Sequence, residues 1–155
     1  MFGAIDLSIN CYILCATGYA EESVQRATSF LRANGFRVVF LGLKSGPIFS
    51  AEGASLTPTV LLSHFIGEDT KLPLPDTLLV AGGTACGQQL LADPRVHRLI
   101  QMMRLAAKPV GFLYPISYAL VGLQSQQTWP QPFLLQEQRM PTDFLSRFTQ
   151  QFHHQ

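Results

Sequence analysis

Short apolar runs alternate with amphipathic segments along the chain, and this alternation is its main structural signal. The apolar runs are rich in Val, Ile, Leu and Phe and stop at glycine or proline, as buried strands do. They predict strands at residues 11–16, 37–43, 77–81 and 110–114, with one more short strand within 128–136.

The segments between these runs carry helix and turn signals. Residues 21–35 place apolar side chains at helical spacing behind two acidic residues, and Asn34-Gly35 is a good helix stop. Asp93-Pro94 predicts the start of a second helix, with Asp93 as its cap. Two glycine turns within 46–58 predict a hairpin or a short excursion. Weaker helix patterns cover residues 57–64, 116–123 and 141–154.

This order of elements predicts a flavodoxin-like α/β fold: a doubly wound, mainly parallel sheet with helices on both faces. In such sheets, ligands bind at the carboxyl ends of the strands, near the point where the strand order reverses. Three predicted loops would meet there, at residues 17–23, 82–87 and 114–117. We therefore expect any functional site in those loops.

Composition narrows the class of protein. The 155 residues fit one domain spanning 1–155, and only 14% are charged, against about 25% in an average soluble domain. A net charge of +1 with scattered basic residues predicts no direct nucleic-acid binding. We expect a cytoplasmic protein without a secretory signal or membrane span. The sparse charge predicts association, as a homodimer or with a regulatory partner.

The cysteines do not suggest a special chemistry. Cys11, Cys15 and Cys86 form no disulfide framework and no recognisable metal site, so we predict no metal and no cofactor. Cys11 and Cys15 share one face of the first predicted strand and are interpreted as core residues. Cys86 is interpreted as a buried packing residue, with a relocated nucleophile as the alternative.

Several segments, in this order, resemble the ThiJ/PfpI superfamily of glutamine-amidotransferase-like domains. Residues 11–43 are similar to that family's first strand, helix and second strand. DTLLVAGGTA, at 76–85, resembles the strand that ends in a Gly-Gly oxyanion loop, and residues 90–120 resemble the helix and strand that lead to the nucleophile elbow. Residues 42–64 and 74–83 are most similar to the amino-terminal sensing domain of AraC-type transcription regulators. The part after the elbow is shortened.

The departures from the family pattern concern its catalytic groups. The position of the family's nucleophilic Cys falls on Tyr114, and its acidic residue near the first helix falls on Ser23. The usual His after the elbow has no counterpart. Pro115 follows Tyr114 and has no N–H to act as an oxyanion donor, and a phenol without a nearby base is a poor nucleophile. The resemblance therefore implies a domain without the family's catalytic residues.

We interpret the chain as a non-catalytic ligand-sensing or regulatory interaction domain. Its predicted ligand-binding residues come from the three loops and are Ser23, Gly82, Gly83, Thr84, Tyr114 and Pro115. Two interpretations stay open for the Gly82–Thr84 segment, an anion-binding loop or a tight turn. Tyr114 either lines a pocket or fills it. The alternative function is a divergent amidase or hydratase that uses Cys86, or a water activated by Glu21 or Glu22.

Overall fold

The computed structural model describes residues 9–66 and 72–115 with their side chains, and the backbone of a strand at 133–135. The helices are α1 (Glu21–Ala33), α2 (Thr84–Ala92) and α3 (Pro94–Leu105), with a 3₁₀ turn, η1 (Leu62–His64). The strands are β1 (Asn10–Leu14), β2 (Arg37–Gly42), β3 (Ile48–Phe49), β4 (Ser55–Leu56), β5 (Val60–Leu61), β6 (Thr77–Val80), β7 (Val110–Phe112) and β8 (Phe133–Leu135).

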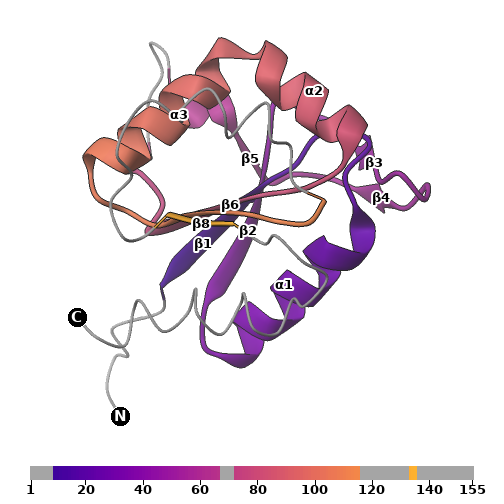
Figure 1. Cartoon of the computed structure of the whole chain (residues 1–155), viewed down its shortest axis with the longest axis horizontal. Helices are drawn as coiled ribbons and strands as arrows, with labels where there is room; N and C mark the ends of the chain where they lie inside the picture. Colours follow the sequence, from indigo (N-terminus) through magenta and orange to yellow (C-terminus); the bar gives the residue numbers. More distant parts are fainter. Residues whose placement is uncertain (1–8, 67–71, 116–132, 136–155) are drawn as a thin grey trace.

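One parallel sheet forms the centre of the molecule (Figure 1). It has six strands in the order β5-β2-β1-β6-β7-β8, and every neighbouring pair is parallel. Tyr12 on β1 lies opposite Val39 of β2 and Leu78 of β6. The strand order reverses between β1 and β6, so the loops after these two strands flank the crevice at the carboxyl edge. β3 and β4 form a separate antiparallel hairpin.

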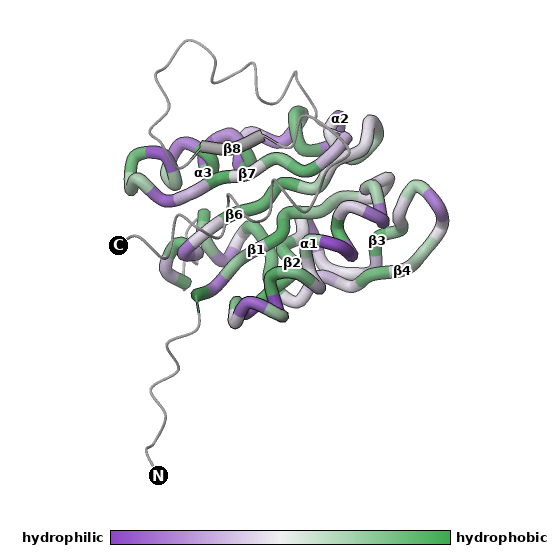
Figure 2. The backbone as a smooth tube through the Cα atoms, turned by 60° about the horizontal axis from the view of Figure 1, so that its bottom comes forward, coloured by the Kyte–Doolittle hydropathy of each residue, from purple (hydrophilic) through white to green (hydrophobic). Residues whose placement is uncertain are grey.

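The helices lie on both faces of this sheet, α1 on one side and α2 with α3 on the other (Figure 1). Coverage on both faces explains why β6 is mostly apolar without alternation, since all its residues are buried. Figure 2 shows the same pattern, with hydrophobic residues concentrated on the central strands β1 and β6. On α1 the buried face consists of Val24, Ala27, Thr28 and Leu31, which follow the predicted helical spacing.

The structure confirms the predicted fold class, the strands and the helices that begin at Glu21 and Pro94. It also confirms the hairpin and the short strand within 128–136, which is β8. The helix predicted for 57–64 is wrong in its first half. Val60 and Leu61 pair with β2 as the edge strand β5, because the β-branched Val60 suits a sheet edge, and only Leu62–His64 is helical.

A second correction concerns residues 82–87, which we predicted to be a loop. The helix α2 begins at Thr84, so only the glycine pair is irregular. The sequence pattern hid this helix because its apolar stripe is interrupted by Gly87, Gln88 and Gln89. The helices predicted at 116–123 and 141–154 lie outside the described residues.

Candidate functional site

The three predicted loops meet at the carboxyl edge of the sheet and are joined through their backbones. The Ala20 N–H, at the start of α1, donates to the Gly82 carbonyl at 2.8 Å. The Gly83 N–H donates to the Pro115 carbonyl at 3.0 Å. The loops after β1, β6 and β7 therefore form one hydrogen-bonded unit, although almost a hundred residues separate its ends.

The glycine pair is required by the close packing of these loops. A Cβ on Gly82 would lie 2.5 Å from the Pro115 oxygen and 2.6 Å from the Tyr114 carbonyl carbon. A Cβ on Gly83, whose φ is +117°, would lie 2.5 Å from the Gly18 oxygen. These contacts are with backbone atoms, which cannot turn aside as a flexible side chain can. Of the two interpretations of this segment, the structure favours the tight turn.

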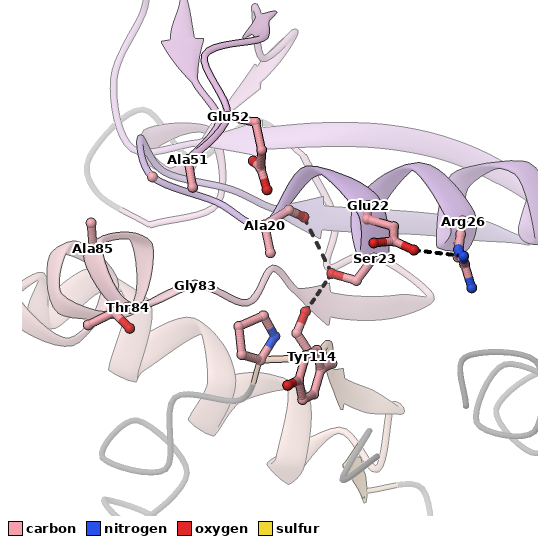
Figure 3. Close-up of a pocket in the computed structure, with 12 residues that line it drawn as sticks. Ala20, Glu22, Ser23, Arg26, Ala51, Glu52, Gly83, Thr84, Ala85 and Tyr114 are labelled. Carbon is pink, nitrogen blue, oxygen red and sulfur yellow. Dashed lines mark hydrogen bonds and ion pairs between the residues drawn. The ribbon is translucent and has the colours of Figure 1, made fainter. Parts of the chain in front are cut away.

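Ser23 and Tyr114 are in direct contact. The Ser23 hydroxyl lies 2.5 Å from the Tyr114 carbonyl oxygen and 3.3 Å from the Ala20 carbonyl oxygen (Figure 3). The hydrogen bond that it donates to Tyr114 is the shorter of the two. The two residues are 91 positions apart in the chain. The bond is to the Tyr114 backbone, and it joins the start of α1 to the loop after β7.

A cavity of about 740 Å³ opens above this unit (Figure 3). Its wall includes five of the six predicted ligand-binding residues. Gly82 is the exception, because it lies against the Tyr114–Pro115 backbone and is not part of the cavity wall, so ligand binding at Gly82 stays a prediction. The full wall consists of Gly18, Ala20, Glu22, Ser23, Arg26, Ala51, Glu52, Gly83, Thr84, Ala85, Tyr114 and Pro115.

The β3–β4 hairpin supplies part of this wall, which the sequence analysis did not foresee. The Gly18 N–H donates to the Phe49 carbonyl at 2.7 Å, and the Ala51 N–H donates to the Tyr19 carbonyl at 2.9 Å. These bonds hold the hairpin on the loop after β1 and bring Glu52 to the cavity. No local pattern signals the docking, because its partners lie about thirty residues away along the chain.

The cavity has two acidic side chains and one basic side chain in its wall. Glu22 and Arg26 form an ion pair at 2.6 Å on α1, with side chains that are 75% and 56% exposed. A pair this exposed contributes at most about 1 kcal/mol to stability and remains available to a ligand. Glu52 comes from the opposite side (Figure 3). Glu21 does not line the cavity, and its carboxylate accepts a hydrogen bond from Gln25.

Cys86 is a packing residue in this structure. Its side chain is fully buried, and its thiol lies 3.8 Å from the Ala81 carbonyl. Burial is the main cause that raises the pKa of the Cys86 thiol to about 11, which opposes thiolate formation at neutral pH. Cys86 is also absent from the cavity wall. These observations weigh against a relocated nucleophile. Cys11 and Cys15 are likewise fully buried.

The described residues offer neither a metal site nor a membrane span. No group of three or more His, Cys, Asp or Glu side chains there could hold a metal ion. In the same part of the chain, no helix is both long and apolar enough to cross a bilayer.

Comparison with known proteins finds similar folds, and no similar family model or curated sequence. No family model and no curated protein sequence matches the chain. A cysteine-to-alanine mutant of the DJ-1 superfamily protein STM1931 from Salmonella typhimurium is 15% identical, with a TM-score of 0.75 over 94% of this chain and 91% of that one. The chain has the fold of DJ-1/ThiJ/PfpI superfamily proteins. The predicted resemblance is thus confirmed at the level of the fold.

Two other structures with the DJ-1-like fold show how widely it is shared. An AraC family transcriptional regulator from Pseudomonas putida is 17% identical, with a TM-score of 0.66 over 94% of this chain and 91% of that one. The VC2308 protein is 20% identical, with a TM-score of 0.60 over 68% of this chain. This chain covers 52% of VC2308, about half its length. At these identities the likeness establishes the fold, and function has to be argued from the site.

Proposed function

We propose that this chain is a non-catalytic ligand-sensing or regulatory domain whose ligand occupies the cavity around Ser23 and Tyr114. One observation carries the proposal: the Gly83 N–H donates to the Pro115 carbonyl. In an acyl-transfer enzyme with this fold, a donor in the Gly-Gly loop would have to face the oxyanion of the reacting substrate. In this chain the Gly83 N–H is instead bonded to the protein's own Pro115 carbonyl.

The rest of the cavity wall supports the same proposal. Tyr114 stands at the predicted nucleophile position, and its carbonyl is bonded by Ser23. Pro115 has no N–H with which to replace the occupied donor. Among the described residues that line the cavity there is no Cys and no His. An open cavity whose described wall holds no Cys or His, and whose Gly83 N–H is already bonded to Pro115, is suited to binding.

The charges in the wall indicate which ligands fit. Glu22 and Glu52 outnumber Arg26, so a neutral or cationic polar molecule matches the cavity better than an anion. Similarity to the P. putida AraC family regulator supports a role in regulation. With its basic residues scattered along the sequence, this chain would act on transcription through a protein partner rather than by binding DNA itself.

A turnover assay tests the non-catalytic part. The wild-type protein, Glu22→Gln and Cys86→Ala are incubated with p-nitrophenyl acetate and, separately, with glutamine. We expect all three to match the buffer rate. Turnover that Cys86→Ala abolishes would overturn the proposal in favour of a thiol enzyme. Turnover that Glu22→Gln abolishes would favour an enzyme that uses a glutamate-activated water.

A binding titration tests the cavity. Propylammonium serves as the cationic probe, with amide chemical shifts of the labelled protein as the readout. We expect saturable shifts at Ser23, Gly83 and Thr84, and affinity about two- to fivefold weaker in Glu52→Gln, because an exposed charge pair contributes up to about 1 kcal/mol. Glu21→Gln is the matched control, since Glu21 lies outside the cavity wall. Equal weakening in both variants, or no saturable shift, would contradict the proposed ligand site.

A further inference from the structure

A second cavity, of about 650 Å³, lies at the same edge of the sheet and shares no lining residue with the first. Its wall is built from the end of β1, the loop between β2 and β3, and the junction of α2 with α3. Nothing in the proposed function uses it. Its charged side chains are Lys44, Asp93 and Arg95.

Arg95 is held in a fixed position beside this cavity. Its Nε donates to Oδ1 of Asp93 at 3.1 Å, and its Nη2 donates to Oδ2 of Asp93 at 2.7 Å. Nη2 also donates to the Leu43 carbonyl at 3.1 Å, which connects α3 to the loop after β2. A guanidinium held by three hydrogen bonds loses little further freedom when a ligand binds to its remaining edge.

The hydrogen bonds between Asp93 and Arg95 engage all the acceptor atoms of the Asp93 carboxylate but not all the donors of the Arg95 guanidinium. Both Asp93 oxygens are engaged, because Oδ1 also accepts the Arg95 backbone N–H at 2.9 Å as the cap of α3. Nη1 of Arg95 takes part in none of these bonds. Lys44 is exposed at the rim and adds a second positive charge. Among the charged groups of the cavity, the unused capacity therefore lies on the two cations, and the net charge of its wall is opposite in sign to that of the first cavity.

We propose that this second cavity binds a small organic anion, a carboxylate on a compact apolar body. The carboxylate would accept from Nη1 of Arg95 and from Nζ of Lys44. The apolar body would pack on Leu43, Pro47, Ile48 and Ala92, which line the same cavity. The site is independent of the proposed ligand site, because the two walls have no residue in common.

The test uses benzoate as the probe and benzamide as its neutral isostere. Each is titrated into the isotope-labelled protein while amide chemical shifts are recorded. We expect benzoate to move the amides of Ser45, Gly46 and Gln89 with a dissociation constant of the order of millimolar, reasonable for a fragment of this size. Benzamide should bind at least about fivefold more weakly, because it brings no charge to the two cations.

Two lysine variants make the result specific. Lys44→Gln should weaken benzoate about three- to tenfold, and the exposed Lys44 has no structural bond whose loss would unfold the protein. Lys108→Gln removes the same charge from the loop before β7, at the opposite edge of the sheet, and should change nothing. The proposal is overturned if benzamide binds as well as benzoate, if both variants weaken binding equally, or if the shifts appear at Gly83 and Thr84 instead.

Discussion

Replacing Gly82 by alanine tests the reasoning that the glycine pair serves backbone packing. The added Cβ would lie 2.5 Å from the Pro115 oxygen, 2.6 Å from the Pro115 nitrogen and 2.6 Å from the Tyr114 carbonyl carbon. Carbon atoms do not approach backbone atoms so closely, so the loop after β7 must move away from the loop after β6. We expect this movement to weaken the two hydrogen bonds that join the three loops.

The magnitude of this loss follows from the contacts. Overpacking of one carbon costs about 1–3 kcal/mol. The Ala20–Gly82 and Gly83–Pro115 hydrogen bonds, at 2.8 Å and 3.0 Å, contribute about 1 kcal/mol each. Gly82→Ala should therefore lower the free energy of unfolding by about 2–5 kcal/mol, a large fraction of the ~5–15 kcal/mol that typical domains have.

Urea unfolding followed by circular dichroism measures this loss, and Gly35→Ala is the control. Gly35 follows α1 with a φ of +85°, but a Cβ there would meet nothing within 4 Å. Its substitution carries only the conformational cost of a left-handed backbone, about 1–2 kcal/mol. If Gly82→Ala were as stable as Gly35→Ala, the loops would yield to the extra carbon. The packing explanation would then fail, and an anion-binding role for the glycine pair would regain support.

Two further predictions concern Cys86 and Asp93. With a pKa of about 11 and full burial, Cys86 should resist iodoacetamide at pH 7.5 in the folded protein and react once guanidinium unfolds it. Labelling of the folded wild-type protein that disappears in the Cys86→Ala variant would refute this prediction. Asp93→Ala should cost about 1–2 kcal/mol at pH 7, because it removes the cap of α3. Hydrogen bonds from Arg95 lower the Asp93 pKa, so this contribution is present above the usual Asp value of ~3.9 and is lost as the pH falls below it. A stability gap that stayed constant from pH 7 to pH 3 would contradict the assignment.

Predictions from local pattern succeeded where burial or a capping signal in neighbouring residues decides the structure. β6 is an apolar run with all residues buried, and the Asp93-Pro94 start of α3 is a capping signal contained in neighbouring residues. The same approach missed α2, whose apolar stripe is interrupted by Gly87 and two glutamines. It also misread Val60 and Leu61, because pairing with Leu41 and Gly42 of β2 overrides the local helix signal.

The site was predicted in part. The fold rule placed the three loops together, and the resemblance pointed to Ser23 and Tyr114, which are in contact. Gly82 was chosen for its place in the loop, but its close approach to the Tyr114–Pro115 backbone keeps it out of the cavity wall. Glu52 and Ala51 were missed, because only the hydrogen bonds of the hairpin to Gly18 and Tyr19 bring them there.

The sequence by itself determined four strands of the sheet, the helices α1 and α3 and the glycine pair after β6, and through the resemblance it predicted Tyr114 at the family's nucleophile position. These features depend on residue type and on spacing over a few positions. Only the tertiary structure decided that the Pro115 carbonyl accepts a hydrogen bond from the Gly83 N–H. It also decided that the β3–β4 hairpin completes the cavity around Ser23 and that Arg95 lies beside the second cavity. The reason is physical: a hydrogen-bond donor pairs with whichever acceptor the fold brings near, and here donor and acceptor lie tens of residues apart in the chain.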